Sequence, residues 1–169
     1  MRPLLILAAL LLPLPSQAAV EITHFKSGLA CTKTTLTQGG DGWICQPTQD
    51  VLVTDQGVCV FNGENNPCTW TGFEFDYTGA KKGEKLQCVS RTSAPVNSGN
   101  PVELIAEDVT SQSYELELDG GSGHVFNPQY YVFALHPKSE AALIEDGHCT
   151  SDGKVVFEYR FHVRFPSRD

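Results

Sequence analysis

The clearest pattern in the sequence is an alternation of apolar and polar residues over positions 155–165. One set of alternate positions holds only large apolar side chains, and its members are Val155, Phe157, Tyr159, Phe161, Val163 and Phe165. The other set is mostly charged, and its members are Val156, Glu158, Arg160, His162 and Arg164. Because successive side chains of a β-strand point to opposite faces, this pattern predicts a strand with one buried face. Other strands should pack against that face.

Further extended segments follow one another at intervals of roughly 8–12 residues, with turn signals between them. They cover residues 20–25, 43–45, 51–54, 58–61, 67–77, 85–90, 102–106, 114–118 and 130–135. This spacing predicts an all-β fold, an antiparallel β-sandwich that is loosely Ig-like, with roughly seven to nine strands. Residues 92–101 are rich in Pro, Ser, Gly and Asn and predict a long surface loop. Residues 139–146 predict one short helix before the last strand, with Ser139 as N-cap and Gly147 just past its end.

The segment 67–77 alternates with a fault in the middle. Cys68 and Trp70 share one parity, whereas Phe73, Phe75 and Tyr77 have the other. A β-bulge at Gly72 would bring all five onto one face. The predicted core residues are Trp70, Phe73, Phe75, Phe133, Phe157, Tyr159 and Phe161. Replacing Phe161 by Ala should cost about 3–5 kcal/mol of stability if it is buried.

The first 18 residues have the features of a secretory signal peptide. Arg2 supplies the positive start, residues 4–14 form an apolar run, and small residues precede a predicted cut after Ala18. The apolar run is too short to span a membrane. Residues 19–169 then form a single β-sandwich domain of 151 residues. Removal of Arg2 from the 12 basic residues, against 20 acidic ones, leaves a formal net charge of −9.

All six cysteines lie after the predicted cut, and they are Cys31, Cys45, Cys59, Cys68, Cys88 and Cys149. An even count in an exported chain predicts disulfides. No two cysteines are as close as the C-x-x-C pairs of zinc sites. Six cysteines allow 15 connectivities. Neighbour-first pairing favours Cys31–Cys45, Cys59–Cys68 and Cys88–Cys149.

The hairpin after residue 61 leaves two registers open. Asn62-Gly63 is the preferred pair for a two-residue type I′ turn. A four-residue loop over positions 62–65 would instead place Cys59 directly opposite Cys68. The longer loop is predicted because it brings the two sulfur atoms within bonding reach.

The histidines and glycines carry no recognisable catalytic motif. The glycine-rich stretch 120–123 is followed by His124 and so does not complete G-x-S-x-G. His136 and His148, with Asp146, form a weak candidate metal site because they flank the predicted helix. Scattered surface histidines are commoner, so no metal or other cofactor is assigned, and no catalytic residue is named.

A row of carboxylates is the second chemical candidate. Glu115, Glu117 and Asp119 alternate along one predicted strand. Paired carboxylates can hydrolyse glycosides, and clusters of them can bind calcium. The same spacing fits the solvent face of an amphipathic strand, which is the favoured interpretation.

These observations lead to a functional hypothesis that rests mostly on scaffold. We expect a small, non-enzymatic, periplasmic or secreted binding module that engages a protein partner as an inhibitor, adhesion accessory or assembly factor. The acidic charge disfavours nucleic acid and would suit a basic partner. The alternatives are a secreted metal- or carboxylate-dependent hydrolase and a structural envelope protein. The sequence does not locate the binding surface or set the oligomeric state.

Overall fold

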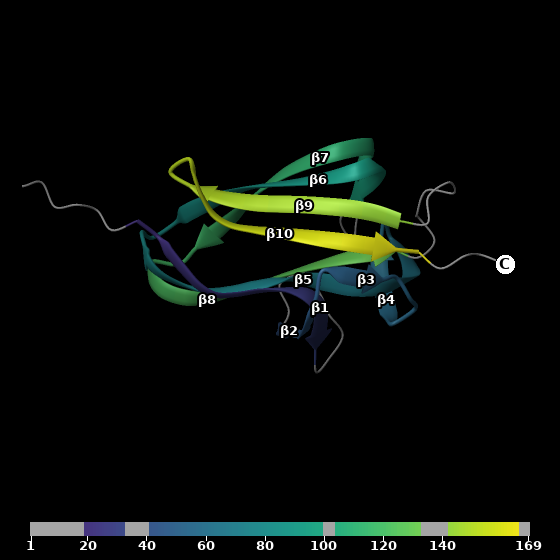
Figure 1. The fold of residues 1–169 in the computed structure, drawn as a ribbon, viewed down its shortest axis with the longest axis horizontal. Coiled ribbons are helices and arrows are strands. Elements are labelled where there is room, and N and C mark those ends of the chain that lie inside the picture. Colours follow the sequence, from purple (N-terminus) through teal and green to yellow (C-terminus); the bar gives the residue numbers. More distant parts are fainter. Residues whose placement is uncertain (1–18, 33–40, 100–103, 133–141, 166–169) are drawn as a thin grey trace, which may run out of the picture.

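The computed structural model describes residues 19–32, 41–99, 104–132 and 142–165 (Figure 1). Within these residues the chain forms ten strands and no helix. The strands are β1 (Glu21–Thr32), β2 (Gly42–Pro47), β3 (Asp50–Leu52), β4 (Gly57–Phe61), β5 (Glu64–Ala80), β6 (Glu84–Gly99), β7 (Leu104–Leu118), β8 (Gly121–Val132), β9 (Ala142–Ser151) and β10 (Lys154–Arg164). The prediction of an all-β fold is confirmed.

The strands form two sheets stacked as layers (Figure 1). Sheet A has the order β2-β1-β5-β4, with β8 also paired to β5. Sheet B has the order β3-β10-β9-β6-β7. Neighbouring strands are antiparallel, except that β3 runs parallel to β10. This arrangement is the predicted sandwich, with more strands in its described part than the seven to nine expected.

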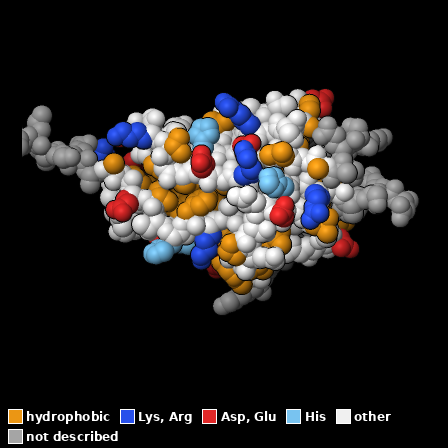
Figure 2. Space-filling view, viewed as in Figure 1, with side chains coloured by type: hydrophobic (Ala, Val, Ile, Leu, Met, Phe, Trp, Pro, Cys, Tyr) orange, Lys and Arg blue, Asp and Glu red, His pale blue; other side chains and the backbone are white. Residues whose placement is uncertain are grey.

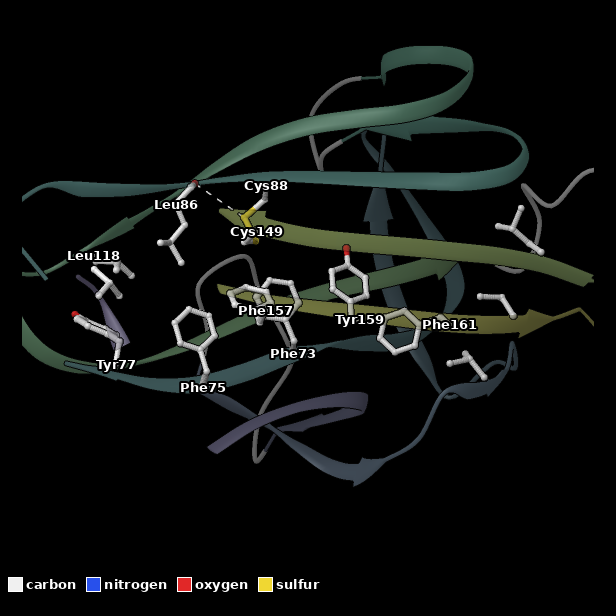
Figure 3. Packing of buried hydrophobic residues seen from close by; sticks show 14 of the residues in the cluster. Phe73, Phe75, Tyr77, Leu86, Cys88, Leu118, Cys149, Phe157, Tyr159 and Phe161 are labelled. Atoms are coloured by element: carbon white, nitrogen blue, oxygen red, sulfur yellow. Dashed lines mark hydrogen bonds between the residues drawn. A yellow bond between two sulfur atoms is a disulfide. The ribbon is translucent and has the colours of Figure 1, made fainter. Parts of the chain in front are cut away.

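The core lies between the sheets and is centred on aromatic rings from β5 and β10 (Figure 3). Five of the predicted core residues are confirmed as buried: Phe73, Phe75, Phe157, Tyr159 and Phe161. The ring centroid of Phe73 is 5.1 Å from that of Phe157 and 5.4 Å from that of Tyr159. Phe133 lies outside the described residues.

β5 does not contain the bulge predicted at Gly72. Its pairing with β1 and with β8 runs through Gly72 without a register shift. Trp70 therefore faces away from Phe73 and is not part of the main core. It packs on the outer face of sheet A in a smaller cluster with Ala30, Ile44 and Phe126. Glycine is required at position 72 for a different reason, because a Cβ there would lie 2.2 Å from the backbone oxygen of Asn127.

The three disulfides pair as predicted. They are Cys31–Cys45, Cys59–Cys68 and Cys88–Cys149, and no cysteine is free. The third joins directly opposite residues of β6 and β9 within the core. Three disulfides fit an oxidising compartment.

The four-residue loop predicted at 62–65 is wrong. β4 and β5 pair Phe61 with Glu64, so Asn62-Gly63 forms a two-residue turn. Both turn residues have the positive φ angles that type I′ requires, 51° and 78°. Cys59 lies opposite Asn66 and reaches Cys68 diagonally, with a Cα–Cα distance of 5.8 Å. The prediction failed because it required opposite positions, whereas diagonal neighbours on one face are also close enough to bond.

Two segments predicted to leave the sheets are strands instead. Residues 92–99 of the predicted surface loop continue β6, which pairs irregularly with β7 there. Residues 142–146 of the predicted helix belong to β9, and residues 139–141 lie outside the described part. Pairing with β6 and β10 overrides the local helix propensity. Gly147 lies within β9 and does not end a helix. Glycine is required at this position because a Cβ would lie 2.2 Å from the ring of Tyr159.

The alternation of β10 holds except at its start. The register with β9 shifts between Val155 and Phe157, so Val156 is the extra residue of a bulge. Val156 packs against the core, and Val155 is 58% exposed. The prediction that Val155 shares the buried face and Val156 the solvent face is therefore wrong. From Phe157 onward the alternation is as predicted.

Candidate functional site

One side of the sandwich is bordered by two strands that lack a neighbour along much of their length. β1 pairs with β5 over residues 21–29 and with β2 only from Gly28 onward. β10 pairs with β9 along its length, but with β3 only over residues 162–164. No strand of the described residues pairs with the other edge of residues 21–26 or 154–161. We call the side between these two edges the open side; β10 and β1 border it in Figure 1.

The chain itself closes one end of the open side. Thr48 donates its N–H to the carbonyl of Ser27 in β1 at 3.2 Å. Gln49 accepts the N–H of His162 in β10 at 2.7 Å. Residues 48–50 therefore cross from sheet A to sheet B. The ladder along β10 stops at His162 because the chain turns away to β1 at this point.

The backbone groups that β10 presents to the open side follow from its contacts with β3. His162 donates its N–H and Arg164 accepts through its carbonyl on this edge. Alternate residues of a strand direct these groups to the same edge. Glu158 and Arg160 therefore also direct their N–H and C=O groups there. These four groups meet no strand in the described part of the chain.

Apolar side chains lie between the two edges. Ile22, Phe25 and Val156 are half-buried and pack against the core. The ring of Phe25 stacks on that of Phe157 at a centroid distance of 4.8 Å. We call these four residues the apolar seam. Figure 2 shows hydrophobic side chains at the surface between β10 and the lower sheet.

A bulge in β1 places Phe25 in the seam. The register with β5 shifts between Thr23 and Lys26, and His24 has a φ of 51°. The extra residue sends Phe25 inward and His24 to the outer face of sheet A. There His24 Nδ1 lies 2.9 Å from Asp76 Oδ2, and His124 Nδ1 lies 2.8 Å from Asp76 Oδ1. The Asp76 carboxylate therefore ties the bulge to β5 and β8.

The two histidines lower the pKa of Asp76. Their hydrogen bonds are the main cause, with His124 contributing more than His24. The cluster is exposed, with 77% of the His24 side chain accessible. Each imidazole approaches a different carboxylate oxygen, so the three side chains do not converge on one point as the ligands of a metal would.

We expect Asp76→Asn to change the acid limb of the stability profile. A lowered pKa in the folded state means that ionised Asp76 stabilises the fold above its ordinary pKa of 3.8. That contribution is lost as the pH falls through the lower folded value. Urea unfolding at several pH values between about 2 and 5 should show a shallower acid slope for the variant. Parallel profiles for the two proteins would contradict this role.

A buried polar cluster lies between the sheets, next to the core. Glu145 is 8% exposed, and its carboxylate accepts hydrogen bonds from Tyr131, from Ser90 at 2.7 Å and from Tyr159 at 3.3 Å. Gln129 donates to the Tyr159 hydroxyl at 3.1 Å. Three donors on one carboxylate satisfy it without a cation. The cluster links β6, β8, β9 and β10 and leaves Glu145 no free face for chemistry.

This cluster predicts a measurable alkaline transition. Burial, followed by the nearby Glu145 charge, raises the pKa of Tyr131 and Tyr159 strongly, and burial raises the pKa of Tyr114 to about 12. The unfolded chain loses these protons first, so stability should fall as the pH rises above about 10. In a phenolate absorbance titration, these tyrosines should ionise only with unfolding. Reversible ionisation of all five tyrosines near pH 10 in the folded protein would contradict the burial.

The carboxylate row predicted on residues 115–119 is a solvated strand face. Glu115 is exposed, with Lys85 Nζ at 2.6 Å and Gln87 Nε2 at 3.0 Å. The hydrogen bond from Lys85 is the main cause that lowers the pKa of Glu115. Glu117 is also exposed on β7, and Asp119 follows the end of that strand. A carboxylate held ionised in the open is poorly suited to act as a general acid.

Two of the three weak metal candidates, His148 and Asp146, lie in the described part of the chain. His148 and Asp146 lie on the outer face of β9, where Arg160 binds Asp146. His136 lies outside the described residues. In the described ranges, no group of three or more His, Cys, Asp or Glu side chains could hold a metal ion. His162 was predicted to lie on a solvated strand face, and its side chain is partly exposed there, with Nδ1 3.5 Å from Asp50 Oδ1.

Comparisons with known proteins assign no family to this chain. No protein-family model matches the sequence, and no curated protein is significantly similar to it. Within the described part of the chain, no helix is long and apolar enough to cross a membrane.

Sequence reasoning missed the open side. Phe25 was placed in an opening strand and Glu158 on a charged face, and both placements suit a residue in a paired strand equally well. The sequence holds one weak signal of the bulge in β1. Residue 24 has a positive φ and is a histidine, which tolerates that conformation better than a β-branched residue. Nothing local to β10 shows that its ladder ends at His162, because the ending depends on where residues 48–50 run.

Proposed function

We propose that this protein is a non-enzymatic, exported binding module that engages a protein partner through the open side. The observation that carries the proposal is the coincidence of an apolar seam with backbone groups of β10 that meet no strand among the described residues. Apolar contacts supply binding energy, and strand edges supply directional hydrogen bonds. An unshielded edge is otherwise a liability in a soluble domain.

Two further features support this assignment. The Glu115 carboxylate is exposed and bound by Lys85 on a solvated strand face, which favours a binding role over the alternative of a carboxylate hydrolase. The three disulfides and the apolar start of the sequence favour a periplasmic or secreted location. The mass of the secreted protein, with residues 1–18 removed and six thiol hydrogens lost, would test export directly. Free thiols or an uncleaved chain would argue against it.

The binding role is tested by affinity capture with a matched pair of variants. Tagged mature protein is used to capture partners from envelope extract and culture medium. Glu158→Lys alters the open side, whereas Glu117→Lys makes the same change on the distant edge strand β7. We expect one saturable partner to be retained equally by the wild type and by Glu117→Lys, and to be retained less by Glu158→Lys. The net charge of −9 leads us to expect that retention falls as salt increases.

Other outcomes would overturn the assignment. Equal capture by Glu158→Lys would move binding away from the open side. Stoichiometric bound metal, or turnover on a hydrolase substrate panel that is lost in Glu117→Gln, would favour the hydrolase. Absence of any saturable partner from both sources would favour the structural envelope protein.

A further inference from the structure

We infer that the open side takes up its partner by strand addition, so that an extended segment of the partner lies antiparallel along β10, on the edge where β3 ends. This inference rests on the proposed function and specifies its partner. The segment would pair with Glu158 and Arg160 and would carry an apolar–basic–apolar sequence at the point of contact.

The backbone of sheet B defines the position of the added strand. β3 covers only residues 162–164 of β10. No strand follows it along this edge of β10 because Thr48 turns away and donates its N–H to Ser27 in β1. Glu158 and Arg160 present two N–H donors and two C=O acceptors along the same edge. An added antiparallel strand would therefore form its hydrogen bonds on the same edge of β10 that β3 already occupies at the other end.

The side chains of this protein next to the added strand determine which residue types the partner segment should carry. An added strand points alternate residues inward, next to Phe157 and Tyr159 and over the seam residue Phe25. These positions favour apolar side chains. The residue between them points outward beside Glu158, which is exposed and forms no ion pair with another described residue. A basic residue fits there, since opposite charges on facing strand positions attract.

Arg160 does not offer the same preference. Its guanidinium already binds Asp146 on β9. The residue that faces Arg160 from an added strand therefore gains little from a negative charge. The charge preference of the site is concentrated at Glu158.

A second copy of this chain fits the site less well. The antiparallel register that pairs Glu158 of one copy with Arg160 of the other would set residues 154–156 against residues 162–164. That stretch of β10 is already covered by β3. The register centred on Glu158 would oppose two carboxylates. A separate protein segment is therefore the better occupant.

The test uses synthetic pentapeptides and isotope-labelled mature protein. The probe is acetyl-Thr-Val-Lys-Val-Thr-amide, and its matched control has Glu in place of Lys. In the antiparallel register the lysine opposite Glu158 directs its N–H and C=O to β10, and the two valines direct theirs away from it. A third peptide therefore carries an N-methyl group on the central lysine, and a fourth carries it on a neighbouring valine. Amide chemical shifts of Glu158 and Arg160 report ladder formation.

We expect the Lys peptide to shift these two amides and to bind about two- to fivefold more tightly than the Glu peptide. In Glu158→Lys this preference should reverse, and in Glu117→Lys it should remain. N-methylation of the lysine should abolish the shifts, and N-methylation of the valine should preserve them. Shifts at Glu158 and Arg160 that are insensitive to the site of N-methylation would overturn strand addition. So would an absence of shifts at saturating peptide, even if capture through the open side had already upheld the binding role.

Discussion

Phe73→Ala is expected to destabilise the fold by about 3–5 kcal/mol. Phe73 is fully buried in β5, and its ring contacts those of Phe25, Phe75, Phe157 and Tyr159. Truncation removes the transfer free energy of the ring and leaves a cavity that rigid neighbours on two sheets cannot fill. Urea unfolding monitored by tryptophan fluorescence or circular dichroism gives the free energy of unfolding directly.

Phe126→Ala is the matched control for this prediction. Phe126 is half-buried on the outer face of sheet A, where it packs with the smaller cluster around Ile44. We expect it to cost clearly less than Phe73→Ala, because less area leaves water on folding. Phe161, also fully buried, should behave as Phe73 does. Equal costs for Phe73 and Phe126 would contradict a core centred between the sheets.

Replacing both Cys88 and Cys149 by Ala should be the most damaging of the three disulfide deletions. The bond joins residues 61 apart in the sequence, whereas Cys59 and Cys68 are only 9 apart. A crosslink that closes a longer loop removes more entropy from the unfolded chain, so the loop-closure relation gives about 4 kcal/mol against about 2.5 kcal/mol. The Cys88–Cys149 bond also fills space in the core, which adds to its contribution.

The two double variants are compared by urea unfolding under non-reducing conditions. An equal or larger loss for the Cys59–Cys68 pair would show that loop length does not govern the effect here. A fall in the denaturant dependence of the Cys88–Cys149 variant would point to residual structure in the unfolded chain instead.

The fold was predictable where the pattern is local. The period of two over residues 157–164 gave β10 and its buried face, because that period depends only on backbone geometry. Asn62-Gly63 signalled its two-residue turn correctly, and the prediction failed only where a disulfide argument was allowed to override it. Neighbour-first pairing of the cysteines succeeded because the hairpins β1–β2 and β4–β5 bring sequence neighbours together.

The errors occurred where non-local pairing outweighs local preference. Residues 142–146 contain good helix formers, yet they lie between β6 and β10 and complete two ladders. Trp70 was assigned to the core through a bulge predicted at Gly72, which the regular pairing of β5 with β1 and β8 does not contain. A sheet with clusters on both faces has room for aromatic residues on either. Glu145 gave no sign of its burial, because its hydroxyl partners come from three other strands.

By itself the sequence determined the all-β class, the disulfides within β1–β2 and β4–β5, and the buried face of β10 from Phe157 onward, since each depends on alternation or on short separations along the chain. Only the tertiary structure decided which strand edges have no neighbour among the described strands. The open side exists because residues 48–50 cross between the sheets and end the ladder at His162. It also exists because a bulge in β1 turns Phe25 toward Phe157. Both depend on contacts between residues more than 100 positions apart, and no local pattern records them.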